Sequence, residues 1–217
     1  MDLALLLADL PPEQRLALAY APRSARPAFA GMLALDTRLA RIIRASREPM
    51  LAQLRLAWWR EQLESTAPAP AGEPLLELLS IWGEHRAGLV ALVDGWEALL
   101  GDAPLEASRL SAFAAGRGAA ASALSQSLGL RKAAEEAERA AHNWTLADLA
   151  ARLSHPEEVQ NARDLLAEAQ WRRPRLPPAL RPLAVLHALA AGSRGQGDLL
   201  QGPRSLATVL RVGLFGI

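Results

Sequence analysis

PAFAGMLALDTRLARIIRASREPMLAQLRLAWWREQLE, residues 27–64, contains two apolar segments joined by a short break at residues 46–49. In both segments apolar residues recur three and four positions apart, the spacing that places them on one face of a helix. The proline of the break suits the first turn of a new helix. The stretch therefore predicts two consecutive helices. Because no convincing strand pattern occurs elsewhere in the chain, we expect an all-α fold.

The second segment has two apolar faces when its residues are placed about 100° apart. A helix with two apolar faces is typical of the middle of a bundle, so we expect burial on both sides. Glu61 falls within the first face, and we expect its carboxylate to extend to the helix end or to pair with an arginine, because buried charges are usually paired. The first face contains Met50, Leu51, Leu54, Ala57 and Trp58, and the second contains Leu56, Trp59 and Leu63.

The first segment has a carboxylate within its apolar stripe. Asp36 lies near the middle of this stripe, on which Leu39 and Ile43 are predicted to be buried. Arg38 and Arg41 lie on the opposite side and Arg44 toward the boundary. Arginines three positions apart usually form a solvated basic face. The full stripe is Phe29, Met32, Leu35, Leu39, Ile42 and Ile43.

Composition limits the classes of function. The 217 residues suit a single domain, 1–217, with a linker near 65–72 (STAPAPAG). A net charge of +1 gives no reason to expect nucleic-acid binding. The absence of cysteine excludes disulfides, thiolate catalysis and iron–sulfur or zinc–thiolate sites. No stretch approaches the roughly 18 uninterrupted apolar residues of a spanning helix, so we expect no transmembrane segment and a cytoplasmic protein.

The remaining chain predicts further helices, about eight to ten in all. They cover residues 13–20, 73–82, 86–100, 105–128, 131–154, 155–171, 178–191 and 203–215. Within 105–128 the tract AAGRGAAA, residues 114–121, contains two glycines, each costing roughly 1 kcal/mol in a helix relative to alanine. Something is therefore expected to lie close against this backbone. Four histidines on separate segments lack metal-ligand spacing and are expected to be structural: His85, His142, His155 and His187.

The order of a helix containing ALD, a REPM break and then LRLAWWREQLE resembles the N-terminal part of the squalene/phytoene synthases. This resemblance implies an isoprenoid-synthase-like helical bundle around a central cavity, open or filled. The small-residue tract is similar to a cavity-lining segment of that family, and the alternative is tight contact between helices. The synthases carry two acidic motifs, and the resemblance places the following residues on their positions: Ala40, Arg41 and Arg44 for the first, and Thr145, Asp148, Arg152 and Pro156 for the second.

Both acidic motifs are therefore degenerate in this chain. Synthases ionise a prenyl diphosphate with magnesium held between carboxylates and phosphates. At about 5 Å and an effective dielectric constant of ~20, a unit charge interacts with a divalent ion by roughly 6 to 7 kcal/mol, so replacing a carboxylate by arginine changes the energy by on the order of 10 kcal/mol. We expect no metal site at these positions.

Two functions remain open. The first is a non-catalytic assembly or scaffold factor without a cofactor, similar to the mitochondrial complex I assembly branch of the family, with a protein partner in respiratory-complex assembly. The second is a transferase acting on prenyl diphosphates, with magnesium bound by the residual carboxylates Asp36, Glu61 and Asp148.

The arginines at the altered positions suggest a further alternative. If Arg44, Arg117 and Arg152 meet at the mouth of the cavity, they match phosphate oxygens without a metal and could bind an isoprenoid or anionic lipid. Such a ligand would place the protein at the periphery of the inner membrane. Alternatively these arginines pair with carboxylates such as Asp148 and fill the site.

Overall fold

The computed structural model describes residues 3–45 and 48–216, so the first two residues of the predicted break, Ser46 and Arg47, lie outside the described residues. The described residues form helices and connections without a strand, which confirms the all-α prediction with about eight to ten helices. In chain order the elements are α1 (Leu3–Ala8), α2 (Pro12–Leu18), α3 (Arg26–Ala45), α4 (Pro49–Glu64), α5 (Pro74–Leu79), η1 (Ser80–Arg86), α6 (Ala87–Ala98), α7 (Ala107–Ser127), η2 (Arg131–Ala133), α8 (Ala134–Arg152), α9 (Pro156–Glu168), η3 (Pro178–Leu180), α10 (Arg181–Ser193), α11 (Gly202–Leu210) and η4 (Arg211–Phe215).

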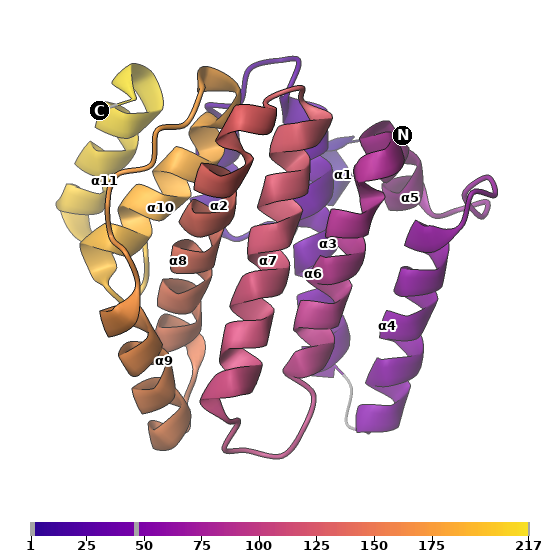
Figure 1. Cartoon of the computed structure of the whole chain (residues 1–217), viewed down its shortest axis with the longest axis horizontal. Coiled ribbons are helices and arrows are strands. Elements are labelled where there is room, and N and C mark those ends of the chain that lie inside the picture. Colours follow the sequence, from indigo (N-terminus) through magenta and orange to yellow (C-terminus); the bar gives the residue numbers. More distant parts are fainter. Residues whose placement is uncertain (1–2, 46–47, 217) are drawn as a thin grey trace.

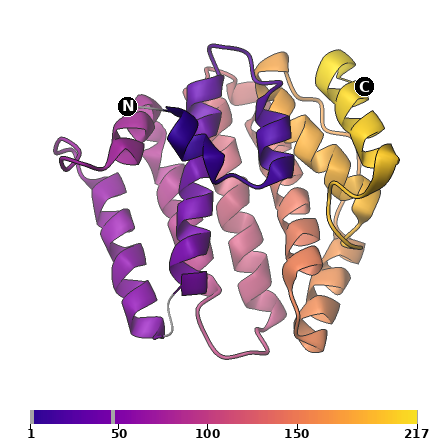
Figure 2. The same ribbon diagram turned by 180° about the vertical axis from the view of Figure 1, so that it is seen from behind.

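The long helices lie side by side in a slab (Figure 1). Helix α7 lies between α6 and α8, while α4 packs against α6 and α9 packs against α8. On the other side of the slab α3 and the N-terminal helices cover this row (Figure 2). Helices α4 and α11 lie at opposite ends of the slab in both views. Among the residues described, no helix has the length and apolar character needed to cross a membrane.

The small-residue tract of α7 forms a close contact with α6. A Cβ atom added to Gly116 would lie 2.4 Å from the carbonyl oxygen of Ala91, and one added to Gly88 would lie 2.2 Å from the Cβ of Ala123. Both distances are too short for real side chains, so the two backbones can approach only because these positions have none. The alternative of tight helix contact is therefore confirmed.

Helix α4 differs from the prediction. Its face with Leu56, Trp59 and Leu63 is buried, but Leu54 is 63% exposed and Trp58 is 38% exposed. The expectation of burial on both sides is wrong because α4 is an edge helix, packed against α3 and α6 on one side only. Glu61 is exposed for the same reason.

The other burial predictions have mixed outcomes. Leu39 is fully buried, as predicted. Ile43, in the last turn of α3, is only partly buried. Residues 65–72 form an irregular, largely exposed connection between α4 and α5, in agreement with the predicted linker.

The packing of α6 against α7 generates a stability prediction. Gly116→Ala should lower the free energy of unfolding by about 2 kcal/mol, within the range for overpacking, because the added methyl group meets backbone that cannot rotate away. The matched change Gly192→Ala, where a Cβ would meet nothing within 4 Å, should be neutral or stabilise by up to about 1 kcal/mol. Urea unfolding of both variants measures the difference, and similar effects at the two glycines would contradict this account of the contact.

Candidate functional site

Arg117 joins two carboxylates at the centre of the bundle. From α7 its Nη2 donates to Asp36 Oδ2 on α3 at 2.9 Å, and its Nη1 donates to Asp148 Oδ2 on α8 at 3.3 Å. Asp36 also accepts a hydrogen bond of 2.8 Å from Trp96 Nε1 on α6. The side chains of Arg117 and Asp36 are only 4% and 5% exposed. Four helices thus meet at one buried polar group.

Aromatic rings surround the guanidinium of Arg117. Its Cζ lies 4.5 Å from the ring centre of Trp144, 4.6 Å from that of Phe113 and 5.9 Å from that of Trp96. Aromatic faces attract cations, and the attraction is stronger where water is excluded. The rings and the two carboxylates together compensate for the removal of the Arg117 charge from water.

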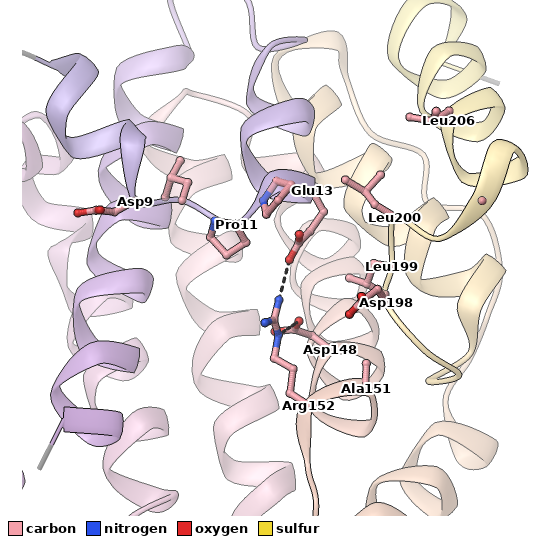
Figure 3. Close-up of a pocket in the computed structure, with 13 residues that line it drawn as sticks. Asp9, Pro11, Glu13, Asp148, Ala151, Arg152, Asp198, Leu199, Leu200 and Leu206 are labelled. Atoms are coloured by element: carbon pink, nitrogen blue, oxygen red, sulfur yellow. Dashed lines mark hydrogen bonds and ion pairs between the residues drawn. The ribbon is translucent and has the colours of Figure 1, made fainter.

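A second arginine pairs with the outer side of the same cluster. Arg152, four residues after Asp148 on α8, donates through Nε to Asp148 Oδ1 at 2.6 Å and through Nη2 to Glu13 Oε1 on α2 at 2.7 Å. Figure 3 shows Arg152 between Glu13 and Asp148. The cluster therefore contains three carboxylates and two guanidinium groups, joined in one chain of ion pairs from α3 to α2.

Burial dominates the ionisation of this cluster. Loss of hydration raises the pKa of Asp36, and the charge of Arg117 and the bond from Trp96 oppose this rise. Loss of hydration also raises the pKa of Glu13, and the charge of Arg152 opposes this rise. The charges of the two arginines thus oppose the rise in pKa that burial causes.

Two cavities border the cluster. A small one of about 170 Å³ is lined by Asp36 and Arg117 together with Ala40, Arg41, Arg44, Asp148 and Arg152, among others. A larger cleft of about 870 Å³ lies between residues 9–13, the end of α8 and residues 198–206, with Arg152 at its floor (Figure 3).

The structure brings most of the residues singled out in the sequence to one place. Ala40, Arg41 and Arg44 of α3 and Asp148 and Arg152 of α8 all line the small cavity. Thr145 and Pro156 do not. The Thr145 hydroxyl is buried and donates to the Ala141 carbonyl oxygen, and Pro156 is exposed at the start of α9.

The arginines on α3 do not form a uniform solvated face. Arg41 pairs with Asp9 at 2.6 Å, and Arg38 approaches Glu73 at 3.6 Å. Arg44 is exposed at the rim of the small cavity. On α4, Arg60 Nε donates to Asp94 Oδ1 of α6 at 2.8 Å and Arg60 Nη2 pairs with Glu97 of the same helix, while Glu61 is exposed to solvent.

The donor atoms at the centre do not suit magnesium. This ion prefers oxygen ligands in near-octahedral geometry, usually from carboxylates that are free to approach it. Asp36 and Asp148 are instead directed at Arg117, and the adjoining positions contribute Arg41, Arg44 and Arg152. Within the described part of the chain, no group of three or more acidic or histidine side chains is arranged to bind a metal ion.

Two members of the cluster were not identified as such from the sequence. Glu13 lies in a short helix far from Arg152 in the chain, and no local pattern indicates that they pair. Trp96 donates a hydrogen bond to Asp36 from α6, and no local sequence pattern indicates this contact. The sequence does give a signal for Arg117, because a lone charge among small residues on a buried helix needs a partner.

Comparisons of the chain with models of known protein families, with curated proteins and with solved structures find no match. The roles of Arg117, Asp36 and Asp148 are therefore inferred from their geometry.

The four histidines lie on separate elements, as expected from the sequence. His187 on α10 is 3% exposed, its ring lies 5.6 Å from that of Trp171, and its Nε2 atom has no hydrogen-bond partner. Burial and, to a lesser extent, the charge of Arg139 lower the pKa of His187 to about 4, against a smaller opposing effect of Glu136. This imidazole is therefore neutral at pH 7.

Removal of the Arg117 charge should be strongly destabilising. Arg117→Met retains a long apolar side chain but leaves Asp36 and Asp148 buried without their cation, which costs about 3–5 kcal/mol in comparable pairs. In this background Asp36→Asn should recover part of the loss. Urea unfolding measures both effects, with Arg163→Met on the exposed side of α9 as a control expected within about 0.5 kcal/mol of wild type. A loss below 1 kcal/mol for Arg117→Met would contradict the proposed bridge.

The buried His187 predicts a pH dependence of stability. Because its pKa is lower in the folded state than in the unfolded state, the unfolded chain binds the proton first, and stability falls as the pH drops from about 6.5 toward 4. The shift corresponds to on the order of 3 kcal/mol across this window. His187→Leu should remove this part of the pH dependence in urea titrations at pH 7 and pH 4.5. An unchanged difference between the two pH values would show that His187 is not responsible.

Proposed function

We propose that this chain is a non-catalytic protein of the squalene/phytoene synthase type that acts as an assembly or scaffold factor, with subunits of a respiratory complex as partners. The observation that carries the non-catalytic part is the position of Arg117. Its guanidinium engages Asp36 and Asp148, the buried carboxylates nearest to where a prenyl diphosphate and its magnesium ions would need free ligands.

The exposed face of α4 supports a role in protein interaction. Met50, Leu51, Leu54 and Trp58 are between 38% and 70% exposed on one edge helix. Contiguous exposed apolar side chains often mark interaction sites in soluble proteins. Tryptophan is also among the residues that contribute most to the energy of protein interfaces.

The charge distribution supports a position at the periphery of a membrane. Residues 171–217 contain seven arginines and one acidic residue, although the whole chain has a net charge of only +1. Leu206, Leu210, Leu214 and Phe215 in the same region are more than half exposed. Basic residues next to exposed apolar ones favour contact with an anionic lipid surface.

The first test addresses catalysis. Incubation with farnesyl or geranylgeranyl diphosphate and magnesium should give no diphosphate release above that of the reaction without protein. Magnesium should also leave the melting temperature unchanged. A bound ligand at 100 times its Kd would raise the free energy of unfolding by about 2.7 kcal/mol, which would raise the melting temperature. Magnesium-dependent release that is lost in Asp36→Asn or Asp148→Asn would overturn the proposal in favour of a prenyl transferase.

The second test addresses the partner. In a strain that lacks the gene for this chain, native gels should show less assembled NADH:ubiquinone oxidoreductase, and the wild-type gene should restore it. Leu54→Glu on α4 should fail to restore assembly. Ile81→Glu on η1 introduces the same charge at a residue of similar exposure, 52% against 63%, and should restore it. Restoration by both variants would exclude the α4 face, and normal assembly in the deletion strain would exclude this function.

A further inference from the structure

A cavity of about 350 Å³ lies at the C-terminal end of the slab, away from the central cluster. It is enclosed by α10, by α11 with η4, and by the extended segment 171–176. This volume is at the lower end of the range for small-molecule sites. The lining combines apolar side chains with arginines and contains no aspartate or glutamate.

Three arginines reach this cavity: Arg173, Arg181 and Arg211. Arg173 donates to the carbonyl oxygen of Gly216 and Arg181 donates to that of Val212 at 3.4 Å, so both are positioned by backbone. Among the described residues none of the three forms an ion pair with a carboxylate. The positive charge of the cavity is therefore not neutralised by its own lining.

Aromatic and apolar side chains also line this cavity. Trp171 and His187 line it with their rings 5.6 Å apart, together with Leu176 and Ala184. The Nε2 atom of His187 is buried and has no hydrogen-bond partner among the described residues, which is uncommon for a polar atom in a folded protein. The cavity therefore offers an apolar surface next to the Nε2 atom of His187.

A second cavity adjoins the first and extends the basic region. It has a volume of about 600 Å³ and shares Arg173, Pro174, Leu176 and Gly216 with its neighbour. It also adds Arg175 and Pro177, again without an acidic residue. Both cavities are therefore lined by residues of the segment 173–177.

We propose that the first cavity binds an amphiphilic anion, with its phosphate or carboxylate held by Arg181 and Arg211 and a short apolar group against Trp171 and Leu176. Guanidinium groups hold such oxygen atoms through paired, charge-assisted hydrogen bonds. The neutral His187 leaves the arginines as the source of positive charge. This site lies apart from the Arg117 cluster, so it can fail without consequence for the function proposed above.

The proposal is tested by calorimetric titration with decyl phosphate below its micelle concentration. Wild-type protein should bind one equivalent, and inorganic phosphate should bind at least about tenfold more weakly because it lacks the apolar group. Arg211→Gln should weaken decyl phosphate binding by about tenfold, equivalent to about 1.4 kcal/mol. Arg204→Gln removes the same charge from α11, the helix that directly precedes η4, at a position outside this cavity, and should change the affinity less than twofold.

A second variant separates the cavity from surface charge. Ala184→Leu on α10 adds apolar volume to the lining without altering any charge, and should weaken binding while the melting temperature stays near that of wild type. Absence of binding by the folded wild-type protein would overturn the proposal. Equal losses in Arg211→Gln and Arg204→Gln, or equal affinity for inorganic phosphate, would also overturn it.

Discussion

The bridge from Arg117 to Asp36 and Asp148 is the constraint on which the rest of the fold depends. A buried charge is tolerated only when partners replace its hydration. Here one guanidinium donates hydrogen bonds to Asp36 of α3 and Asp148 of α8 and lies among three aromatic rings. Arg152 then balances the charge of Asp148 and extends the chain of ion pairs to Glu13. The bundle therefore closes around a nearly balanced set of charges, and these fix where α3, α7 and α8 lie relative to one another.

The paired charges at the centre of the molecule lie apart from its exposed apolar side chains. The centre is occupied by mutually paired side chains and offers little to a metal or a diphosphate. The exposed apolar side chains lie at the two ends of the slab (Figure 1). One end has the apolar face of α4, and the other has exposed leucines and arginines around α11.

The sequence predicted the helices well, because their periodicity and their proline and glycine boundaries are local signals. The pattern also placed Asp36 in a stripe that is buried, and the three arginines that the resemblance brings together, Arg44, Arg117 and Arg152, line one small cavity. It failed at Leu54 and Trp58, because an apolar face on a helix does not reveal whether another element covers it. The pair of Arg152 and Glu13 was also missed, since partners 139 positions apart leave no local pattern.

The most direct test of the central bridge is the NMR spectrum of the Arg117 side chain, assigned by its loss in Arg117→Lys. A guanidinium held by two buried carboxylates should show separate Nη proton signals that exchange slowly with water, and magnesium with farnesyl diphosphate should not change them. A single averaged signal in fast exchange with water would contradict the account. So would a large shift on addition of magnesium and the diphosphate, because it would show that the centre opens to bind them.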